Sequence, residues 1–231
     1  MTAVTDILFE VSMDKNGFAG FSHLSKESKA LLFRYGALRE TIGRSENAVF
    51  SLGGEYYIKF SRDTLSLKAE KDRAIWLENK VIAPRVVDYR EYTDDCGKGG
   101  YLLTTAVKGI RACDEVFLRS PDRLIHRLAE AMAVFHALDS ASCPFFAERS
   151  DHEEKTTVCH GDFCLPNILF TERSQGFVDV GELGKGDPWL DYAWCLWSLD
   201  YNLKTPLYRP KLLKALGIEF DEARYRRYTE E

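Results

Sequence analysis

The sequence reads VCHGDFCLPN over residues 158–167 and GFVDVG over residues 176–181. In both segments short apolar runs alternate with glycine or proline, a pattern typical of strands that end in tight turns. Asp162, Asn167 and Asp179 fall at these turns, so we expect their side chains on loops beside apolar strands. The two segments therefore present two carboxylates and one amide on loops rather than inside a core.

These three residues match the chemical needs of phosphoryl transfer to a hydroxyl. A carboxylate must accept the hydroxyl proton, which suits Asp162, and hard oxygen ligands must hold Mg²⁺ on the phosphates, which suits Asn167 and Asp179. Alone, each residue has an ordinary explanation as a turn cap, a loop hydrogen bond or a strand end. Their joint spacing, an Asp five residues before an Asn and then an Asp-x-Gly after a hairpin, favours the catalytic role. We interpret His160 in the same loop as a structural hydrogen-bonding residue.

The N-terminal half supplies a lysine and a glutamate that fit the same chemistry. Lys59 lies in the second of two strands joined by a Gly-Gly hairpin turn, and Glu70 lies in the helix expected over residues 68–80. A strand lysine that reaches phosphates while paired to a helical glutamate is the arrangement found in kinases, although alone it is also an ordinary surface ion pair. Ser45 lies in a loop over residues 43–48 that suits a cover for phosphates. That loop is neither a Walker A motif nor a full Gly-x-Gly-x-x-Gly.

The remaining patterns predict an α+β chain with a strand-rich N-terminal part and a helical C-terminal part. Further elements are expected as strands over residues 85–89, 101–107, 168–170 and 176–180, a polar loop over residues 94–100, and helices over residues 31–39, 189–199 and 207–228. Ser120 and Pro121 form a helix start, and an apolar stripe at helical spacing follows: Leu124, Leu128, Met132 and Phe135. We predict a small antiparallel β-sheet lobe over residues 1–104, a hinge over residues 105–109 and a larger, mainly helical lobe over residues 110–231.

Composition and charge indicate a folded protein with a cationic partner. Of the 231 residues, 45% are hydrophobic and 29% are charged, which fits a globular chain with a substantial core. Residues 1–100 carry 15 acidic and 15 basic side chains, whereas residues 101–231 carry 21 acidic and 16 basic ones, so the net charge of −5 lies in the second part. That excess suits a cationic small molecule, although a merely solvated acidic surface is the alternative. A broad basic footprint for nucleic acid is missing, so no nucleic-acid partner is expected.

Other features indicate a cytoplasmic chain without a membrane partner. No stretch approaches the ~20 apolar residues of a membrane helix, and residues 1–15 lack a basic start, so no signal peptide is expected. The six cysteines include no Cys-x-x-Cys pair, so we expect reduced thiols that pack as small hydrophobes. For the assembly we expect a monomer or a weak dimer.

These motifs resemble those of the aminoglycoside O-phosphotransferases, in particular the kanamycin/neomycin 3′-phosphotransferase branch, which has a protein-kinase-like fold. HGDFCLPN over residues 160–167 is similar to the catalytic loop of that family, and GFVDVG over residues 176–181, with Asp187 and Asp191, is similar to its metal-binding segment. The resemblance runs from about residue 42 to about residue 216 and covers most of the chain. It implies a two-lobed α+β fold and the use of ATP and Mg²⁺.

The resemblance also implies roles for single residues. Asp162 would be the catalytic base, and Asn167 and Asp179 would be the magnesium ligands. Asp191 would support the catalytic loop from behind. On the nucleotide side, the implied positions are a phosphate-binding lysine with its glutamate, an adenine-stacking aromatic residue and two backbone contacts to the base: Lys59, Glu70, Tyr57, Thr105 and Val107.

The chain departs from the family's pattern at three places. Glu182 stands where the family usually has an arginine, and an acid beside polyphosphate is unfavourable unless Lys185 or the substrate's amines compensate. Residues 141–157 form a shorter segment than the one that builds much of the aminoglycoside pocket, and residues 200–202 replace acidic residues after the following helix. The remaining acidic side chains expected to bind substrate ammonium groups are Glu148, Asp151, Glu153, Glu154 and Glu231.

We therefore expect an ATP- and Mg²⁺-dependent phosphotransferase that moves the γ-phosphoryl group to an aminoglycoside antibiotic and thereby gives resistance. The 3′-hydroxyl of the kanamycin/neomycin type is the first expectation for the acceptor. The alternatives are a kinase of the same fold that acts on another small alcohol, such as a streptomycin-like drug, a macrolide or a metabolite, and a non-catalytic nucleotide-binding homologue. The complete set of catalytic residues argues against the non-catalytic alternative.

Overall fold

This computed structural model describes residues 20–40, 47–147 and 157–230 of the chain. Within those residues α-helices occur together with antiparallel sheets, so the predicted α+β class is confirmed. None of the helices described is long and apolar enough to cross a membrane. The six cysteines, all within the described part of the chain, form no disulfide bonds.

The described residues up to residue 75, together with residues 84–106, form the first of two compact units, and the other described residues form the second. The short stretch between residues 75 and 84 joins the second unit because the Ile82 carbonyl accepts a hydrogen bond from the Phe177 N–H at 2.9 Å. The lobe and hinge boundaries expected at residues 104–109 stay a prediction.

The first unit is built on a five-stranded antiparallel sheet with the strand order β1-β2-β3-β5-β4. The predicted Gly-Gly turn joins β2 to β3, and Gly53 and Gly54 have φ values of 59° and 70°, which that tight turn requires. The strand bounds are β1 Leu38–Arg39, β2 Ala48–Leu52, β3 Tyr56–Ser61, β4 Val86–Asp94 and β5 Gly97–Thr105.

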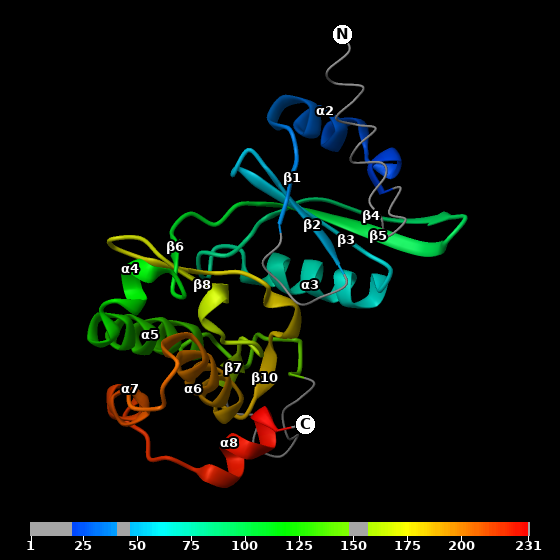
Figure 1. Cartoon of the computed structure of the whole chain (residues 1–231). Helices are drawn as coiled ribbons and strands as arrows, with labels where there is room; N and C mark the ends of the chain where they lie inside the picture. The colour runs from blue at the N-terminus through cyan, green and yellow to red at the C-terminus, as the bar shows by residue number, and fades with distance from the viewer. Residues whose placement is uncertain (1–19, 41–46, 148–156, 231) are drawn as a thin grey trace. The chain divides into compact units, whose positions relative to one another are not determined.

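Side chains of β3 alternate between the two faces of this sheet. Ile58 and Phe60 are buried in an apolar cluster with residues from α2 (Lys26–Tyr35) and the preceding 3-10 helix. Lys59 lies between them and therefore faces the opposite side, where α3 (Thr64–Leu77) follows β3. The sheet lies between α2 and α3 (Figure 1). The buried apolar side chains of β3 thus hold the strand in the sheet, and Lys59 lies on its opposite face.

Several predicted boundaries in this unit are wrong. The helix expected over residues 31–39 is α2, which ends at Tyr35 before a Gly36 cap with φ 68°, so that residues 38–39 form β1 instead. It begins earlier than expected because the Ser25 hydroxyl caps its first turn by accepting the Ser28 N–H at 3.0 Å. α3 also begins before residue 68, because the Asp63 carboxylate accepts the Leu65 and Ser66 N–H groups at 3.1 and 3.0 Å. In both cases a side-chain cap starts the helix one turn upstream of the apolar pattern.

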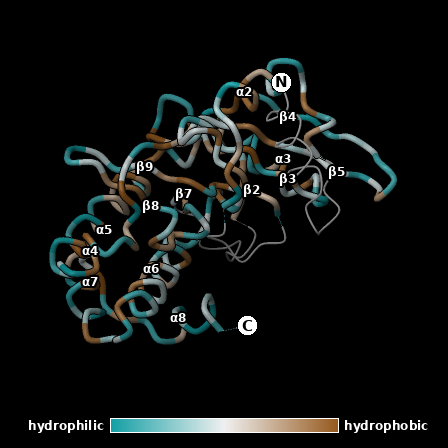
Figure 2. The backbone as a smooth tube through the Cα atoms, turned by 45° about the horizontal axis from the view of Figure 1, so that its top comes forward, coloured by the Kyte–Doolittle hydropathy of each residue, from teal (hydrophilic) through white to brown (hydrophobic). Residues whose placement is uncertain are grey.

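The strand expected over residues 85–89 continues to Asp94, and the polar loop expected after it shortens to a tight turn. Pairing with β5 extends the strand in spite of its polar sequence, because the ladder supplies partners for backbone groups that a loop would leave to water. Figure 2 shows β4 and this turn as largely hydrophilic, which suits a strand at the edge of a sheet.

The second unit combines helices with two small sheets, ordered β6-β8-β9 and β10-β7. The predicted stripe on α5, Leu124, Leu128, Met132 and Phe135, is buried. Ser120 precedes α5 as expected, but its side chain makes no capping hydrogen bond. The bounds in this unit are β6 Ile110–Arg111, α4 Glu115–Leu118, α5 Pro121–His136, β7 Thr157–Cys159, η2 Leu165–Asn167, β8 Ile168–Phe170, β9 Gln175–Phe177, η3 Val180–Glu182, β10 Gly184–Gly186, α6 Trp189–Leu203, α7 Arg209–Leu216 and α8 Glu222–Thr229.

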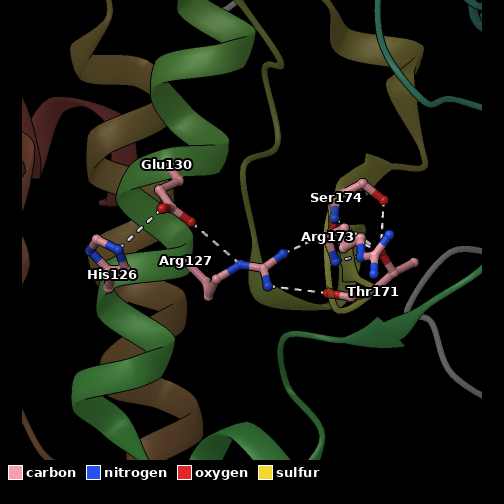
Figure 3. A network of polar contacts seen from close by, with 6 residues as sticks. All are labelled: His126, Arg127, Glu130, Thr171, Arg173 and Ser174. Atoms are coloured by element: carbon pink, nitrogen blue, oxygen red, sulfur yellow. Dashed lines mark hydrogen bonds and ion pairs between the residues drawn. The ribbon is translucent and has the colours of Figure 1, made fainter.

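One arginine of α5 fastens the turn between β8 and β9. Arg127 donates hydrogen bonds to the carbonyls of Thr171 at 3.1 Å and Ser174 at 2.8 Å. Its guanidinium carbon lies 4.6 Å from the centroid of the Phe170 ring. The Glu130 carboxylate lies 3.5 Å from the arginine Nε (Figure 3). The β8–β9 hairpin, which separates Asn167 from Asp179 in the sequence, is therefore tied to α5.

Candidate active site

A buried carboxylate holds the loop that follows β7. Asp191, on the first turn of α6, is fully buried. Its Oδ2 accepts the His160 N–H at 2.8 Å, and its Oδ1 accepts the Gly161 N–H at 2.9 Å. The Nε2 atom of His136 on α5 lies 2.9 Å from Oδ2. Because a buried charge is stable only when it is paired or hydrogen-bonded, this set fixes the backbone just before Asp162.

His160 is buried and ties the same loop to the end of β9. Its Nε2 lies 3.1 Å from the Val178 carbonyl, and its Nδ1 lies 3.4 Å from the Asp162 N–H. A carbonyl only accepts and an N–H only donates, so Nε2 carries the proton and Nδ1 is the acceptor. The imidazole is thus a structural hydrogen-bonding group.

Asp162 and Asn167 face each other across the loop. The Asn167 Nδ2 donates to Asp162 Oδ2 at 2.8 Å and to the Asp162 carbonyl at 3.1 Å. The Leu165 N–H donates to Ser198 Oγ of α6 at 3.0 Å and holds the loop on that helix. Because the amide nitrogen is used by Asp162, the amide oxygen of Asn167 is the atom that it presents to a ligand.

Asp179 joins this group through the β8–β9 hairpin. The Val178 N–H donates to the Asn167 carbonyl at 2.9 Å, so the residue before Asp179 is bonded to Asn167 itself. Asp179 has φ 59° and ψ 52°, a left-handed conformation that is uncommon for any residue except glycine. The strand expected to run through residue 180 therefore ends at Phe177, and Asp179 is exposed. An amide oxygen and a carboxylate are hard ligands that fit Mg²⁺.

Gly161 brings the loop that carries Asp162 against η3. Its φ of +87° lies in the region that favours glycine. A Cβ at this position would overlap the Glu182 carbonyl oxygen and would lie 2.6 Å from the Glu182 Cβ. No larger residue fits there, and Glu182 packs against the residue that precedes Asp162.

Two thiols near the loop have raised pKa values. Burial raises the pKa of Cys159 and of Cys164, and neighbouring carboxylates raise it further. In the described part of the chain, the one cluster of three side chains that could ligate a metal is His136, Cys159 and Asp191. Within this cluster Asp191 accepts two backbone N–H groups, and the Cys159 thiol donates to the Asp187 carbonyl. These hydrogen bonds make the cluster a support for the loop.

In the first unit, Lys59 and Glu70 form the ion pair that the sequence predicts. The lysine Nζ lies 2.6 Å from Glu70 Oε2, and the two side chains are 19% and 17% exposed. β3 holds Lys59 between Val49 of β2 and Leu102 of β5, and α3 carries Glu70. The pair therefore fixes one ammonium group at the centre of the sheet. Its phosphate-binding role stays a prediction.

Two of the three residues predicted to contact adenine, Tyr57 and Thr105, lie at the end of the same sheet. Tyr57 is half-buried and stands two positions before Lys59, on the same face of β3. The Thr105 N–H donates to the Arg85 carbonyl at 2.9 Å, so it is engaged within the sheet. The Val107 N–H makes no hydrogen bond in the part of the chain that the structure describes. Contacts of these residues with a nucleotide stay predictions.

Several predicted site residues lie outside the described residues, so nothing here bears on their placement. They comprise the predicted phosphate-covering serine and all of the predicted substrate-binding acids: Ser45, Glu148, Asp151, Glu153, Glu154 and Glu231.

The structure also shows supporting contacts of Asp187 that sequence reasoning did not predict. Asp187 is buried, and its carboxylate accepts the Trp189 N–H at 3.0 Å, the Tyr228 hydroxyl at 3.1 Å and the Arg224 Nη1 at 3.4 Å. The Cys159 thiol donates to the Asp187 carbonyl at 3.3 Å. These bonds tie α8 to β7, the strand that leads into the Asp162 loop. No local sequence pattern indicates such a contact, because its partners are up to 41 residues apart.

Comparisons with known proteins find relatives that match most of the chain. A profile of the family described as "Phosphotransferase enzyme family" matches residues 39–154 and 146–228. The aminoglycoside 3'-phosphotransferase of Enterococcus faecalis is 25% identical over 89% of this chain and 96% of its own length. The streptomycin 3''-kinase of Streptomyces griseus is 31% identical over 68% of this chain and 75% of its own length.

Solved structures show the same likeness. An aminoglycoside phosphotransferase of Streptomyces rimosus, solved in complex with ADP and streptomycin, superposes with a TM-score of 0.66 at 25% identity. The match covers 89% of this chain and 96% of that one. The protein-kinase-like fold class that the sequence predicts is thereby confirmed.

Proposed function

Since the chain belongs to the phosphotransferase enzyme family, we propose that it transfers the γ-phosphoryl group of ATP to a hydroxyl group of an aminoglycoside. The observation that carries this proposal is the Asp162 loop. Its carboxylate is oriented by Asn167 at 2.8 Å, and the backbone before it is held by the buried Asp191. Relatives named as an aminoglycoside 3'-phosphotransferase and a streptomycin 3''-kinase support an aminoglycoside as the acceptor.

Asp162 acts as the base that receives the proton of the acceptor hydroxyl. As the hydroxyl oxygen bonds to the γ-phosphorus, the bond from that phosphorus to the β,γ-bridging oxygen breaks, and ADP leaves. The proton passes to the Asp162 carboxylate. Because the Asn167 amide restrains one carboxylate oxygen, less orientation has to be gained when the acceptor binds.

Asn167 and Asp179 would hold Mg²⁺ through their amide and carboxylate oxygens. When bound there, the ion neutralises phosphate charge as it develops. Lys59 would bind phosphate oxygens, with Glu70 keeping its ammonium in place at 2.6 Å. Tyr57, Thr105 and Val107 would contact adenine.

The 3′-hydroxyl of the kanamycin/neomycin type is the first candidate acceptor group, and transfer to it would protect a cell from the drug. A streptomycin-type acceptor is the second candidate. It is favoured by the 31% identity to a streptomycin 3''-kinase, which exceeds the 25% identity to an aminoglycoside 3'-phosphotransferase.

An acceptor panel tests the proposal. Purified protein is incubated with Mg·ATP and kanamycin, neomycin or streptomycin, one at a time, and ADP release is followed. We expect release that depends on one of the three drugs. Release that is the same without any acceptor, or none with all three drugs, would contradict the proposal. Asp139→Asn, at an exposed surface position, is a matched control for variants of the loop aspartates.

A further inference from the structure

Glu182 is a half-buried carboxylate that has no partner within the described residues. It ends η3, the short helix that begins directly after Asp179. Its side chain makes no ion pair or hydrogen bond with any residue that the structure describes. Partly buried carboxylates gain from a cationic partner, because burial penalises an unpaired charge. The position beside the catalytic loop makes the identity of that partner a functional question.

The nearest lysine in the sequence does not serve as this partner. The Nζ atom of Lys185 on β10 lies 4.6 Å from the centroid of the Phe146 ring, a cation–π contact. The backbone of Lys185 is also fixed, since its N–H donates to the Phe145 carbonyl at 3.0 Å and its carbonyl accepts the Ala147 N–H at 3.1 Å. Of the two compensating cations expected from the sequence, only the amines of the substrate are left.

The Glu182 carboxylate also does not hold the catalytic loop. That loop is bonded to Asp191 and Ser198, and His160 bonds to the Val178 carbonyl. Glu182 meets the loop through its backbone and Cβ, which lie against Gly161. Removing the carboxylate alone therefore leaves the hydrogen bonds around Asp162 in place.

We propose that Glu182 binds an ammonium group of the acceptor and so selects polycationic alcohols. This inference rests on the proposed function and names a specificity residue of the same site. Because the backbone and Cβ of Glu182 lie against Gly161, the residue directly before Asp162, an amine bound to the Glu182 carboxylate would belong to an acceptor at the Asp162 loop. The same pairing neutralises an acid that would otherwise repel the phosphates.

The test is the isosteric change Glu182→Gln, measured with neomycin as the acceptor. Loss of a charge-assisted contact is expected to raise the KM for neomycin about 10-fold or more. The kcat and the KM for Mg·ATP stay within about twofold, because the lost contact is made equally in the ground state and the transition state. Glu182→Asp keeps the charge and restores part of the affinity. Glu172→Gln, an exposed carboxylate on the β8–β9 turn, is the matched control and changes neither KM.

Other outcomes overturn the inference. An unchanged KM for neomycin in Glu182→Gln would show that Glu182 does not contact the acceptor. A raised Mg²⁺ requirement with an unchanged acceptor KM places Glu182 at the metal, and a fall in kcat alone makes it a positioning residue. If the wild type transfers phosphate to none of the three drugs, that result contradicts the proposed function and leaves the role of Glu182 to a binding measurement. Calorimetric titration of neomycin into wild type and Glu182→Gln then tests the inference by itself. An equal Kd, or no binding to the wild type, overturns it.

Discussion

Replacing Asp191 by asparagine shows how far the catalytic loop depends on its buried support. The carboxylate accepts two backbone N–H groups, from His160 at 2.8 Å and Gly161 at 2.9 Å, and it contacts the His136 imidazole. An amide has one oxygen, so in either orientation its NH₂ group faces at least one of the two backbone donors. A buried donor left unpaired costs about 1–3 kcal/mol. We expect the free energy of unfolding to fall by about that amount.

The same change displaces the backbone before Asp162, and a shift of about 1 Å at a reacting group can lower turnover about 10²-fold. Urea unfolding followed by circular dichroism measures the stability, and equal m values show that the same transition is compared. Asp139→Asn is the control: its carboxylate accepts the Ala141 N–H at 3.0 Å on an exposed loop, where water replaces it. Wild-type stability and kcat in Asp191→Asn would refute the reasoning.

Three further changes probe the metal ligands, the first unit and the hairpin clamp. Asp179→Ala removes a proposed Mg²⁺ ligand, so calorimetry should show Mg·ATP binding weakened beyond the about 10- to 100-fold that loss of an outer-shell partner costs. Asp88 is partly buried, which raises its pKa, but hydrogen bonds from serines and from Tyr101 outweigh burial and hold the pKa below its usual value. The stability that Asp88 supplies is therefore present at neutral pH and is lost as the pH falls below about 4, so urea titrations should show Asp88→Asn converging with the wild type in acid. Arg127→Ala loses two hydrogen bonds to turn carbonyls, and we expect it to destabilise the chain by about 1–3 kcal/mol, with Arg127→Lys recovering only part.

A specific experimental result would contradict each of these three predictions. Normal Mg·ATP binding by Asp179→Ala would remove that residue from the metal site. A stability difference for Asp88→Asn that stays constant down to pH 3 would show that the carboxylate charge is not what the network stabilises. Equal stability of Arg127→Lys and wild type would show that the planar guanidinium is not needed.

Local patterns predicted the elements that carry the candidate site. A Gly-Gly pair between two strand-like runs was enough to predict the β2–β3 hairpin and the place of Lys59, and the apolar stripe predicted α5. The loop residues Asp162 and Asn167 were predicted to share a site, and the structure bonds them to each other. These are short-range features, for which spacing along the chain is sufficient.

The features that were missed depend on contacts between distant residues. His136 meets Asp191 across 55 positions, and Arg127 reaches the Ser174 carbonyl across 47. Nothing near either residue signals its partner. The left-handed conformation of Asp179 ended a strand that its apolar neighbours had predicted to continue, because the turn into η3 requires it. The sequence identified Glu182 as an acid at a position where the family usually has an arginine. Only the structure shows that Glu182 packs against Gly161, directly before Asp162.

The transfer reaction is tested best on its product. Mass spectrometry of neomycin, kanamycin or streptomycin after incubation with the wild-type protein and Mg·ATP reports whether a phosphoryl group has been added. We expect one of these acceptors to gain the mass of one phosphoryl group, with an equal amount of ADP released. In Asp162→Asn the rate should fall by about 10²–10⁴-fold, the usual contribution of a positioned base. Unmodified acceptors in every reaction, or an undiminished rate in Asp162→Asn, would contradict the proposed phosphotransferase mechanism.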